Sequence, residues 1–492
     1  MSCRVRFAFA LAVLGVPAVI SPACKESTGP SSGGNGPLGV GVTVIAGGTQ
    51  RDTANAILVQ ALVLRITDST GRPATEEVVR FQSVPADSQP GTPSTLVGSL
   101  TSQSFWTFAT ATTDDSGEAA ILVQLGPIAG IGRVAVSVPR FAYQDTASFA
   151  ILPGAAVRLG GLRDTALYVG HTGPLHAFVA DQNGNRRPEA VTYQSLNPSV
   201  ATVTGAGAAT AVAVGRATII VRCATPSLTD STHVGVVPPG TLAALVGTFG
   251  TSYGTLLTLN LDGSGITAIP QSSGDNMYLQ WAPDGGSILL FRPSYGGHLY
   301  SMSLAGALTR LVPLSAGFAE DNWARYAANG TYIFFRGVRT GCGGCIYRIQ
   351  PDGTGLDSVP VGSGTQPSPS PDGRGVAYTG WDGQLHVYNY VTATDTSYAI
   401  NAYGAHWSPD GNWIAYTTSD VSQIHIVRPD GSGAQAVSAG SSYGWSFDWS
   451  PDSKWLVASN LSTQTLTLIQ VQTGLELPLG YTAGLTQPTW KP

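Results

Sequence analysis

Six polar residues in the second half of the chain are the strongest candidates for a binding site. They share one position, directly before each copy of a repeated motif: Gln280, Arg325, Ser368, His406, Asp448 and Thr489. The residues that follow them are mostly apolar, which is typical of partly buried strands. If the repeats surround an axis, the six side chains form one ring. Arg325 and Asp448 would then be charged anchors for a ligand or peptide; the alternative is that the ring only lines a solvated channel.

The repeated motif that follows these residues is best seen in Trp407-Ser408-Pro409-Asp410-Gly411. Its other copies begin, at steps of 38–45 residues, at Trp281, Tyr326, Pro369, Trp449 and Trp490. Self-similarity of this period is typical of a β-propeller, in which each repeat forms one four-stranded blade. The six polar residues would then lie on the innermost strand of each blade. We expect the motif tryptophans to pack between blades, although they could instead serve as stacking platforms for sugars.

Each repeat also carries a later Asp-Gly turn, as in Pro429-Asp430-Gly431. Together with the Trp-Ser-Pro-Asp-Gly motif, this turn resembles the TolB-type propeller over residues 241–492. The resemblance implies protein–protein interaction in the periplasm. Tyr326 and Pro369 depart from the family pattern, which leaves the register of the third and fourth blades open. Such propellers sometimes precede a hydrolase domain, and we expect none here because the sequence ends at Pro492.

The two ends of this segment predict how the ring closes. It begins at Leu242–Val246 with no motif strand before it, and it ends at Gln487–Pro492 with an incomplete motif. The last strand could therefore complete the first blade, which would join the two ends and hide a strand edge. The sequence thus predicts six blades.

Histidines support an alternative function. His298, His386, His406 and His425 fall on predicted inner or third strands, and a metal-assisted polysaccharide lyase or a glycosidase could gather such residues. Only His386 and His425 share a repeat position, however, and both are expected far from the axis. The sequence contains no His-Glu-x-x-His motif and no phosphate-binding loop. We therefore favour a non-catalytic protein without a cofactor.

Cys342 and Cys345 form a Cys-x-x-Cys pair in a predicted hairpin loop. A four-cysteine zinc site would need a second pair, and a thioredoxin-like motif would need a helix after the first cysteine. An exported protein meets oxidising conditions, so a local disulfide is the expected state.

Residues 1–23 read as an export signal, with Arg4 and Arg6 before the apolar segment Phe7–Ile20. Small residues precede Cys24, which loosely fits a bacterial lipobox and favours lipidation of Cys24; the alternative is simple secretion. Residues 24–39 are rich in Ser, Gly, Pro and Asn and predict a flexible tether. The protein would be anchored in the periplasm or at the cell surface, or otherwise secreted.

Residues 40–153 predict a β-sandwich, with a long strand at 57–68 and a half-buried strand at 133–138. Turns at Ser69–Gly71 and Asp114–Glu118 lie within a pattern that resembles the bacterial Ig-like domain of the invasin/intimin type. A calcium ion at Asp114–Glu118 is the less favoured alternative to a hairpin turn.

Residues 154–238 predict a second sandwich. The blocks Asn197–Val203 and Gly215–Ile219 stand in the order seen in the second bacterial Ig-like family, which this segment resembles. Tyr193 replaces the usual Trp and keeps an aromatic core role. Cys223 has no partner in this segment and is expected to be a small buried side chain. The Ig-like pair implies surface adhesion or cell-wall contact.

Composition and charge agree with an all-β chain that does not bind nucleic acid. Charged residues make up 11% of the chain, against about 25% in an average soluble domain. The net charge is −5, and no basic run exceeds Arg186-Arg187. We therefore expect an envelope protein in which two Ig-like sandwiches hold a six-bladed propeller that binds an envelope or surface protein or a glycan.

Overall fold

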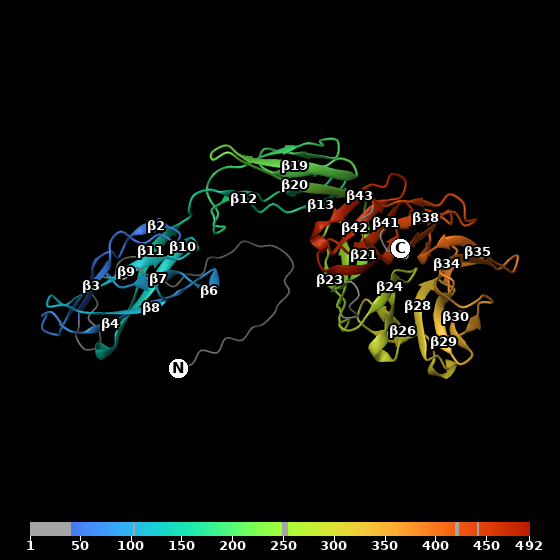
Figure 1. Cartoon of the computed structure of the whole chain (residues 1–492), viewed down its shortest axis with the longest axis horizontal. Helices are drawn as coiled ribbons and strands as arrows, with labels where there is room; N and C mark the ends of the chain where they lie inside the picture. Colours follow the sequence, from blue (N-terminus) through green and yellow to red (C-terminus); the bar gives the residue numbers. More distant parts are fainter. Residues whose placement is uncertain (1–40, 102–103, 248–253, 419–422, 440–441) are drawn as a thin grey trace, which may run out of the picture. The chain divides into compact units, whose positions relative to one another are not determined.

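The computed structural model describes residues 41–101, 104–247, 254–418, 423–439 and 442–492. All regular elements in these ranges are β-strands or short 3₁₀ helices, which confirms the all-β prediction (Figure 1). None of the described helices has the length and hydropathy of a membrane span. The predicted export signal, the tether and Cys24 lie outside the described residues.

The first sandwich consists of two antiparallel sheets and a small hairpin, β5 (Pro85–Ala86) with β6 (Gln89–Pro93). One sheet has the order β1 (Gly41–Ala46), β3 (Leu62–Thr67), β9 (Glu118–Leu125), β7 (Thr95–Gly98). The other has the order β2 (Arg51–Thr53), β11 (Tyr143–Leu152), β10 (Gly130–Val138), β4 (Val78–Ser83), β8 (Phe108–Thr112), in which β2 is the one parallel neighbour.

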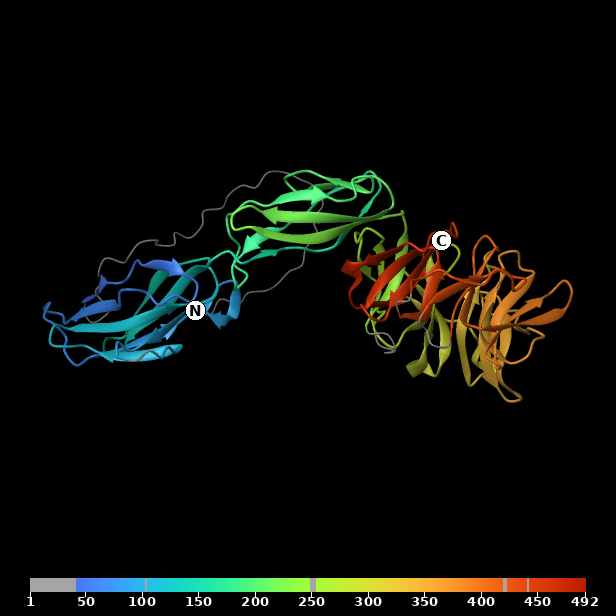
Figure 2. The same cartoon turned by 45° about the horizontal axis from the view of Figure 1, so that its top comes forward.

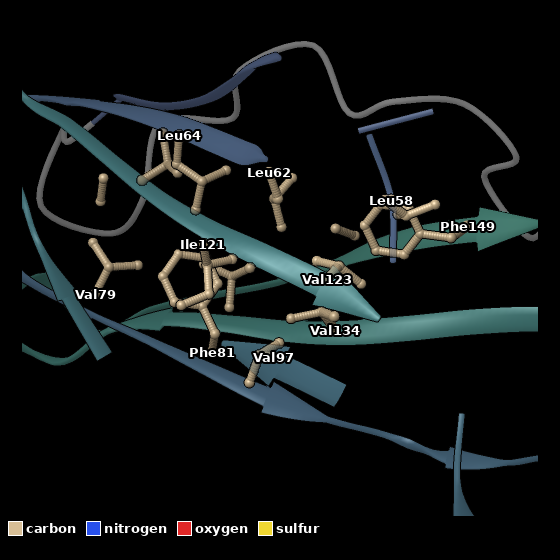
Figure 3. Packing of buried hydrophobic residues seen from close by; sticks show 14 of the residues in the cluster. Leu58, Leu62, Leu64, Val79, Phe81, Val97, Ile121, Val123, Val134 and Phe149 are labelled. Atoms are coloured by element: carbon tan, nitrogen blue, oxygen red, sulfur yellow. The ribbon is translucent and has the colours of Figure 1, made fainter. Parts of the chain in front are cut away.

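Alternating side chains from both sheets fill the space between them, as Figure 3 shows. On β10, Val134, Val136 and Val138 are buried while the residues between them are partly exposed, as the period of two predicts. At the Asp114 turn, the carboxylate oxygen Oδ1 accepts hydrogen bonds from the N–H groups of Ser116 and Glu118 at 2.8 and 2.9 Å. That pattern is a side-chain-capped hairpin turn.

The prediction of a strand over 57–68 is wrong at its start, because the strand begins at Leu62. The side chain of Gln50 accepts a hydrogen bond from the Gln60 N–H at 2.8 Å and donates one to the Gln60 carbonyl at 2.7 Å. These bonds occupy backbone groups that a ladder would use. Val59, next to Gln60, is 91% exposed.

The second sandwich is built from three small sheets. They are β13 (Thr165–Tyr168), β20 (Leu228–Val237), β19 (Gly215–Cys223), β16 (Thr192–Ser195); β14 (Thr172–Pro174), β18 (Ala208–Ala211), β17 (Ala201–Val203); and β12 (Arg158–Gly160), β15 (Phe178–Ala180). Tyr193 packs against the core, and Cys223 is buried, as predicted for both.

Residues 241–492 form six four-stranded antiparallel sheets, which confirms the six-bladed propeller (Figure 2). Blades 1 to 3, from the inner to the outer strand, are β44 (Leu485–Trp490), β21 (Thr241–Val246), β22 (Leu256–Asn260), β23 (Thr267–Ala268); β24 (Met277–Trp281), β25 (Ser287–Arg292), β26 (His298–Ser303), β27 (Leu308–Arg310); and β28 (Glu320–Tyr326), β29 (Ile333–Arg339), β30 (Cys342–Ile349), β31 (Asp357–Ser358).

Blades 4 to 6 follow the same order. They are β32 (Gly364–Pro369), β33 (Gly375–Gly380), β34 (Gln384–Asn389), β35 (Thr394–Asn401); β36 (Tyr403–Trp407), β37 (Ile414–Thr417), β38 (Ile424–Val427), β39 (Gln435–Ala436); and β40 (Tyr443–Trp449), β41 (Trp455–Asn460), β42 (Thr465–Gln470), β43 (Glu476–Leu479). A disulfide joins Cys342 to Cys345 at the start of β30.

The end of the chain closes the ring in the predicted way. Strand β44 pairs antiparallel with β21, so that Trp490 lies opposite Leu242 and Thr489 opposite Ala243. Strand β44 thus serves as the inner strand of blade 1, which hides the edge that β21 would otherwise present. Trp490 is 5% exposed and packs into the core of this closure.

Blades 3 and 4 keep the register of the other blades although their motifs differ. Tyr326 pairs with Ile333 and Pro369 with Val376, as Trp407 pairs with Ile414. Tyr326 is buried like the motif tryptophans Trp281, Trp449 and Trp490. At Trp281, Tyr326 and Trp449, the first motif residue packs in a cluster that two neighbouring blades share.

Candidate functional site at the mouth of the propeller channel

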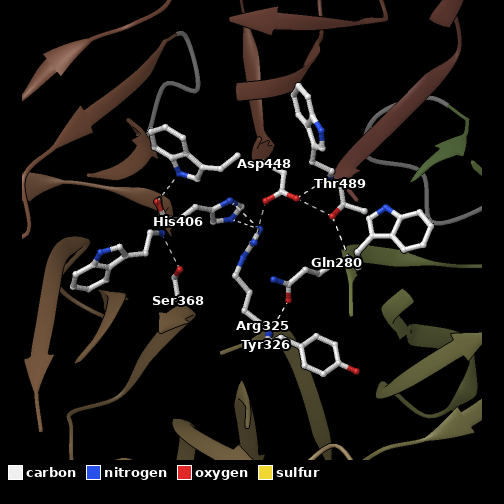
Figure 4. A network of polar contacts seen from close by, with 11 residues as sticks. Gln280, Arg325, Tyr326, Ser368, His406, Asp448 and Thr489 are labelled. Atoms are coloured by element: carbon white, nitrogen blue, oxygen red, sulfur yellow. Dashed lines mark hydrogen bonds and ion pairs between the residues drawn. The ribbon is translucent and has the colours of Figure 1, made fainter. Parts of the chain in front are cut away.

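The six candidate residues converge around the propeller axis, one on each inner strand (Figure 4). They lie deeper than a surface site would require. Ser368 is 4%, His406 8% and Thr489 0% exposed, and the other three are only partly exposed. The ring is therefore part of the channel wall.

Four of the six side chains form a hydrogen bond to the neighbouring blade. Each of them accepts a hydrogen bond from the backbone N–H of the motif's first residue in the following blade. The bonds join Gln280 to Tyr326 (2.7 Å), Ser368 to Trp407 (2.9 Å), Asp448 to Trp490 (3.0 Å) and Thr489 to Trp281 (3.4 Å). These links satisfy backbone donors that the inner strands leave facing the channel. At these four positions, the polar side chain therefore connects neighbouring blades.

Arg325 differs because the next blade begins its motif with Pro369, which has no N–H group. Instead, its guanidinium reaches across the channel. Nη1 lies 3.3 Å from Oδ1 of Asp448, and Nη2 lies 2.8 and 2.7 Å from the two imidazole nitrogens of His406. Figure 4 shows these three side chains pointing toward one another.

Burial controls the protonation of this group. The side chains of Arg325 and Asp448 are 17% and 14% exposed. Burial lowers the pKa of the Arg325 guanidinium, and Asp448 opposes that effect. Burial, reinforced by the positive charge of Arg325, also lowers the pKa of His406 well below its ordinary value. A neutral imidazole can then accept a hydrogen bond from the guanidinium.

A β-bulge lies just before the ring residue on the inner strands. The pairing shifts between Met277 and Gln280 on β24, and equivalent shifts occur on the other five. On five strands, the residue two places before the ring residue has a positive φ. These residues are Tyr278 (56°), Trp323 (47°), Gln366 (53°), Gly404 (69°) and Gln487 (51°).

A pocket opens at this bulged end of the inner strands. All six inner strands contribute to it, so it lies on the propeller axis. Its lining residues are Tyr278, Leu279, Trp323, Ala324, Arg325, Gln366, Pro367, His406, Trp445, Ser446, Phe447 and Pro488. Of the six candidate residues, only Arg325 and His406 reach this pocket.

Large aromatic side chains stand on opposite sides of the pocket. The rings of Tyr278 and Trp323 lie 5.6 Å apart at 55°, and those of Tyr403 and Trp445 lie 5.9 Å apart at 68°. The guanidinium of Arg336 lies over one face of the Trp323 ring, 5.4 Å from its centre. Burial raises the pKa of Tyr278 to about 12, so its hydroxyl is protonated at neutral pH.

The sequence did not single out Tyr278, Trp323 and Trp445, although a signal was present. Each stands two or three places before a ring residue and outside the repeated motif. A tryptophan outside the repeated motif is a candidate for binding, since aromatic residues are enriched at interaction sites.

Of the four histidines considered for a catalytic site, the three besides His406 lie apart from one another, and each has its own contact. His298 lies 2.6 Å from Asp321, a carboxyl whose pKa is raised by burial. His386 lies 3.1 Å from Asp382, and His425 stacks on Tyr416. In the part of the chain that the structure describes, no group of three or more His, Cys, Asp or Glu side chains could hold a metal ion.

Comparison with known proteins supports the Ig-like character of the second sandwich. Residues 163–223 match the family model of the bacterial Ig-like domain, group 2. No curated protein matches the chain.

Among solved structures, TolB from Acinetobacter baumannii is similar, with 16% identity, a TM-score of 0.43 and coverage of 62% of this chain and 83% of that chain. A putative TolB from Agrobacterium tumefaciens has 18% identity, a TM-score of 0.40 and coverage of 52% and 100%. An auxiliary nutrient binding protein from Bacteroides thetaiotaomicron has 10% identity, a TM-score of 0.34 and coverage of 64% and 83%. At these identities the likeness concerns the fold alone.

Proposed function

We propose that the chain is a non-catalytic binding protein of the bacterial cell envelope, in which the propeller holds a protein or glycan at its axial pocket. The observation that carries this proposal is the pocket itself. All six inner strands contribute to it, and Tyr278, Trp323 and Trp445 line it. Pockets with apolar walls and a few fixed polar groups are the usual form of a binding site.

The sandwiches would act as a spacer between the envelope and the propeller. Their bacterial Ig-like character, matched over residues 163–223, supports a location in the envelope or outside the cell. Lipidation of Cys24 belongs to the same proposal. Mass spectrometry of the mature N-terminus tests it, and an unmodified Cys24 would contradict the anchor while leaving the binding proposal intact.

The bonding of Asp448 favours binding over catalysis. Its Oδ1 pairs with Arg325, while Oδ2 accepts hydrogen bonds from the Thr489 hydroxyl at 2.8 Å and the Trp490 N–H at 3.0 Å. Both oxygens of this carboxylate are therefore committed to the channel wall.

Co-sedimentation of the full chain with isolated envelopes tests the proposal. We expect a Trp323→Ala/Trp445→Ala double variant to lose at least about tenfold in affinity, since buried aromatic anchors dominate binding energy. Trp106→Ala is the matched control, because Trp106 is 66% exposed and belongs to the first sandwich. Equal sedimentation of the double variant and the wild type would contradict a site at the pocket.

A further inference from the structure

The axial pocket combines two features that suit one class of ligand. The first is a pair of aromatic walls, formed by Tyr278 with Trp323 on one side and by Trp445 on the other. The ring of Tyr403 contacts Trp445 without lining the pocket. The face of an aromatic ring carries partial negative charge and attracts groups with partial positive charge at their edge. The C–H groups on one face of a sugar ring are such groups.

The second feature is a set of hydrogen-bonding groups at the pocket wall. A guanidinium carries five N–H donors, and Arg325 uses its two terminal nitrogens on Asp448 and His406. The amide oxygen of Gln366 accepts a hydrogen bond from the Gly404 N–H at 2.6 Å, which fixes the amide in place. Ser446 also lines the pocket. Hydroxyl groups that leave water need such partners.

The charges at the base of the pocket balance one another. The positive charge of Arg325 is paired with Asp448 at 3.3 Å, and the only other titratable side chains among the lining residues are His406 and Tyr278. Both are neutral at neutral pH, because burial moves each pKa away from 7. A carboxylate or phosphate ligand would have to compete with Asp448 for the guanidinium and would then leave that carboxylate unpaired.

We propose that the pocket binds the end sugar of an uncharged glycan, with the sugar ring stacked on Trp445 or Trp323 and its hydroxyl groups facing Arg325, Gln366 and Ser446. The pocket is small, so the rest of the glycan chain would continue outside it. This inference rests on the proposed function and deepens it, since it chooses glycan over protein as the envelope ligand.

The test uses the full chain and isolated envelopes that have been treated in one of two ways. Periodate cleaves the vicinal diols of sugars, whereas a protease removes proteins. We expect periodate to abolish co-sedimentation and protease treatment to leave it unchanged. Because the ligand is uncharged, affinity should change less than about twofold between about 0.05 and about 0.5 M salt, where screening would weaken an ionic contact.

Substitutions at Trp445 tie this binding to stacking. Trp445→Phe keeps an aromatic face and should retain most of the affinity, whereas Trp445→Leu keeps apolar bulk without that face and should lose at least about tenfold. Comparing Phe with Leu separates stacking from a loss of folding, since both fill the site. Trp106→Ala should bind as the wild type does.

The outcomes separate the inference from the function on which it rests. Loss of binding after protease treatment but not after periodate, or a steep fall with salt, would overturn the glycan while leaving a binding pocket. Equal affinity of Trp445→Phe and Trp445→Leu would overturn the stacking. Full binding by the Trp323→Ala/Trp445→Ala variant would overturn the pocket, and both proposals with it.

Discussion

The two ends of the propeller's inner strands follow opposite rules. At the turn end, the same contacts recur in blades 4, 5 and 6. The Ser408 hydroxyl donates to Asp410 at 2.6 Å, and Ser450 donates to Asp452 at the same distance. Ser370 and Asp372 repeat this bond in blade 4. Each aspartate also accepts a hydrogen bond from the backbone N–H two residues later. Its carboxylate therefore stabilises its own turn.

At the bulged end, the backbone recurs but the side chains differ. The position two before the ring residue holds Tyr278, Trp323, Gln366, Gly404 or Gln487 in the same left-handed conformation. Gln366 and Gln487 each accept an N–H from the next blade's bulge, at 2.6 and 2.7 Å. Tyr278, Trp323 and Gln366 also line the pocket. Side chains that recur between blades thus lie at the turn end, where they stabilise the fold. Side chains that differ between blades lie at the bulged end, where they could give a ligand site its specificity.

Removing the closing strand should lower stability more than any other change, because it removes contacts at both ends of an inner strand. Deletion of Gln487–Pro492 removes most of the inner strand of blade 1 and its links to Trp281 and Tyr278. We expect a loss of about 5 kcal/mol or more and a fall in Tm of about 10–20 °C. Calorimetry of the full chain measures it.

A shorter deletion is the control for ring closure. Loss of only Lys491 and Pro492, which follow β44, should cost much less. If both deletions unfold at the same temperature as the wild type, the terminal strand does not close the ring.

Arg325→Met should have the next largest effect, because it leaves Asp448 with a buried charge and without its cation. Breaking such a pair costs about 3–5 kcal/mol. The double variant Arg325→Met/Asp448→Asn should recover a large part of this loss, since an amide oxygen can still accept from Thr489 and Trp490. Urea unfolding of the three proteins provides the measurement.

Lys454→Ala is the control for Arg325→Met. Lys454 pairs with Asp452 at 3.7 Å at the turn end, where the two side chains are 73% and 53% exposed. Removing this pair should change stability by less than about 1 kcal/mol. Equal losses in Arg325→Met and Lys454→Ala would show that the channel pair is no more important than a surface pair.

Ser368→Ala should cost about 1–3 kcal/mol, because it leaves the Trp407 N–H without an acceptor inside the wall. Ser368→Thr should be close to the wild type, since Thr489 performs the same role in another blade. Urea unfolding distinguishes the two. Stabilities that do not differ between alanine and threonine would mean that the links between blades are incidental.

His406 should produce the smallest effect, and it depends on pH. Its folded pKa lies below the ordinary 6.5, so between these two values the unfolded chain binds more protons than the folded chain. Stability from this residue is therefore present above pH of about 6.5 and is lost as the pH falls, by at most about 1.4 kcal/mol per pH unit.

The variant His406→Gln isolates this contribution. Its stability should depend less on pH between about 7.5 and about 5.5 than that of the wild type, because the two proteins differ only at this residue. Parallel pH profiles for the two proteins would mean that His406 is not held neutral.

The sequence was sufficient for the blade count and the closure, because the Trp-x-Pro-Asp-Gly spacing reports packing that recurs in every blade. It also placed Arg325 and Asp448 near each other. It did not reveal that Pro369 removes an N–H from the wall and so leaves Arg325 to cross the channel, since this depends on which residues face each other across blades. The bulges were missed for a similar reason: Tyr278 and Trp323 are poor signals for a positive φ, which usually favours glycine.

Hydroxyl-radical footprinting of the full chain, with and without isolated envelopes, tests the central claim most directly. The label on aromatic side chains reports which end of the inner strands is covered. We expect protection of Tyr278, Trp323 and Trp445 at the bulged end, and unchanged labelling of the partly exposed Trp413 at the turn end. Protection of Trp413, or of residues in the sandwiches, with full labelling of the three pocket residues would contradict the account.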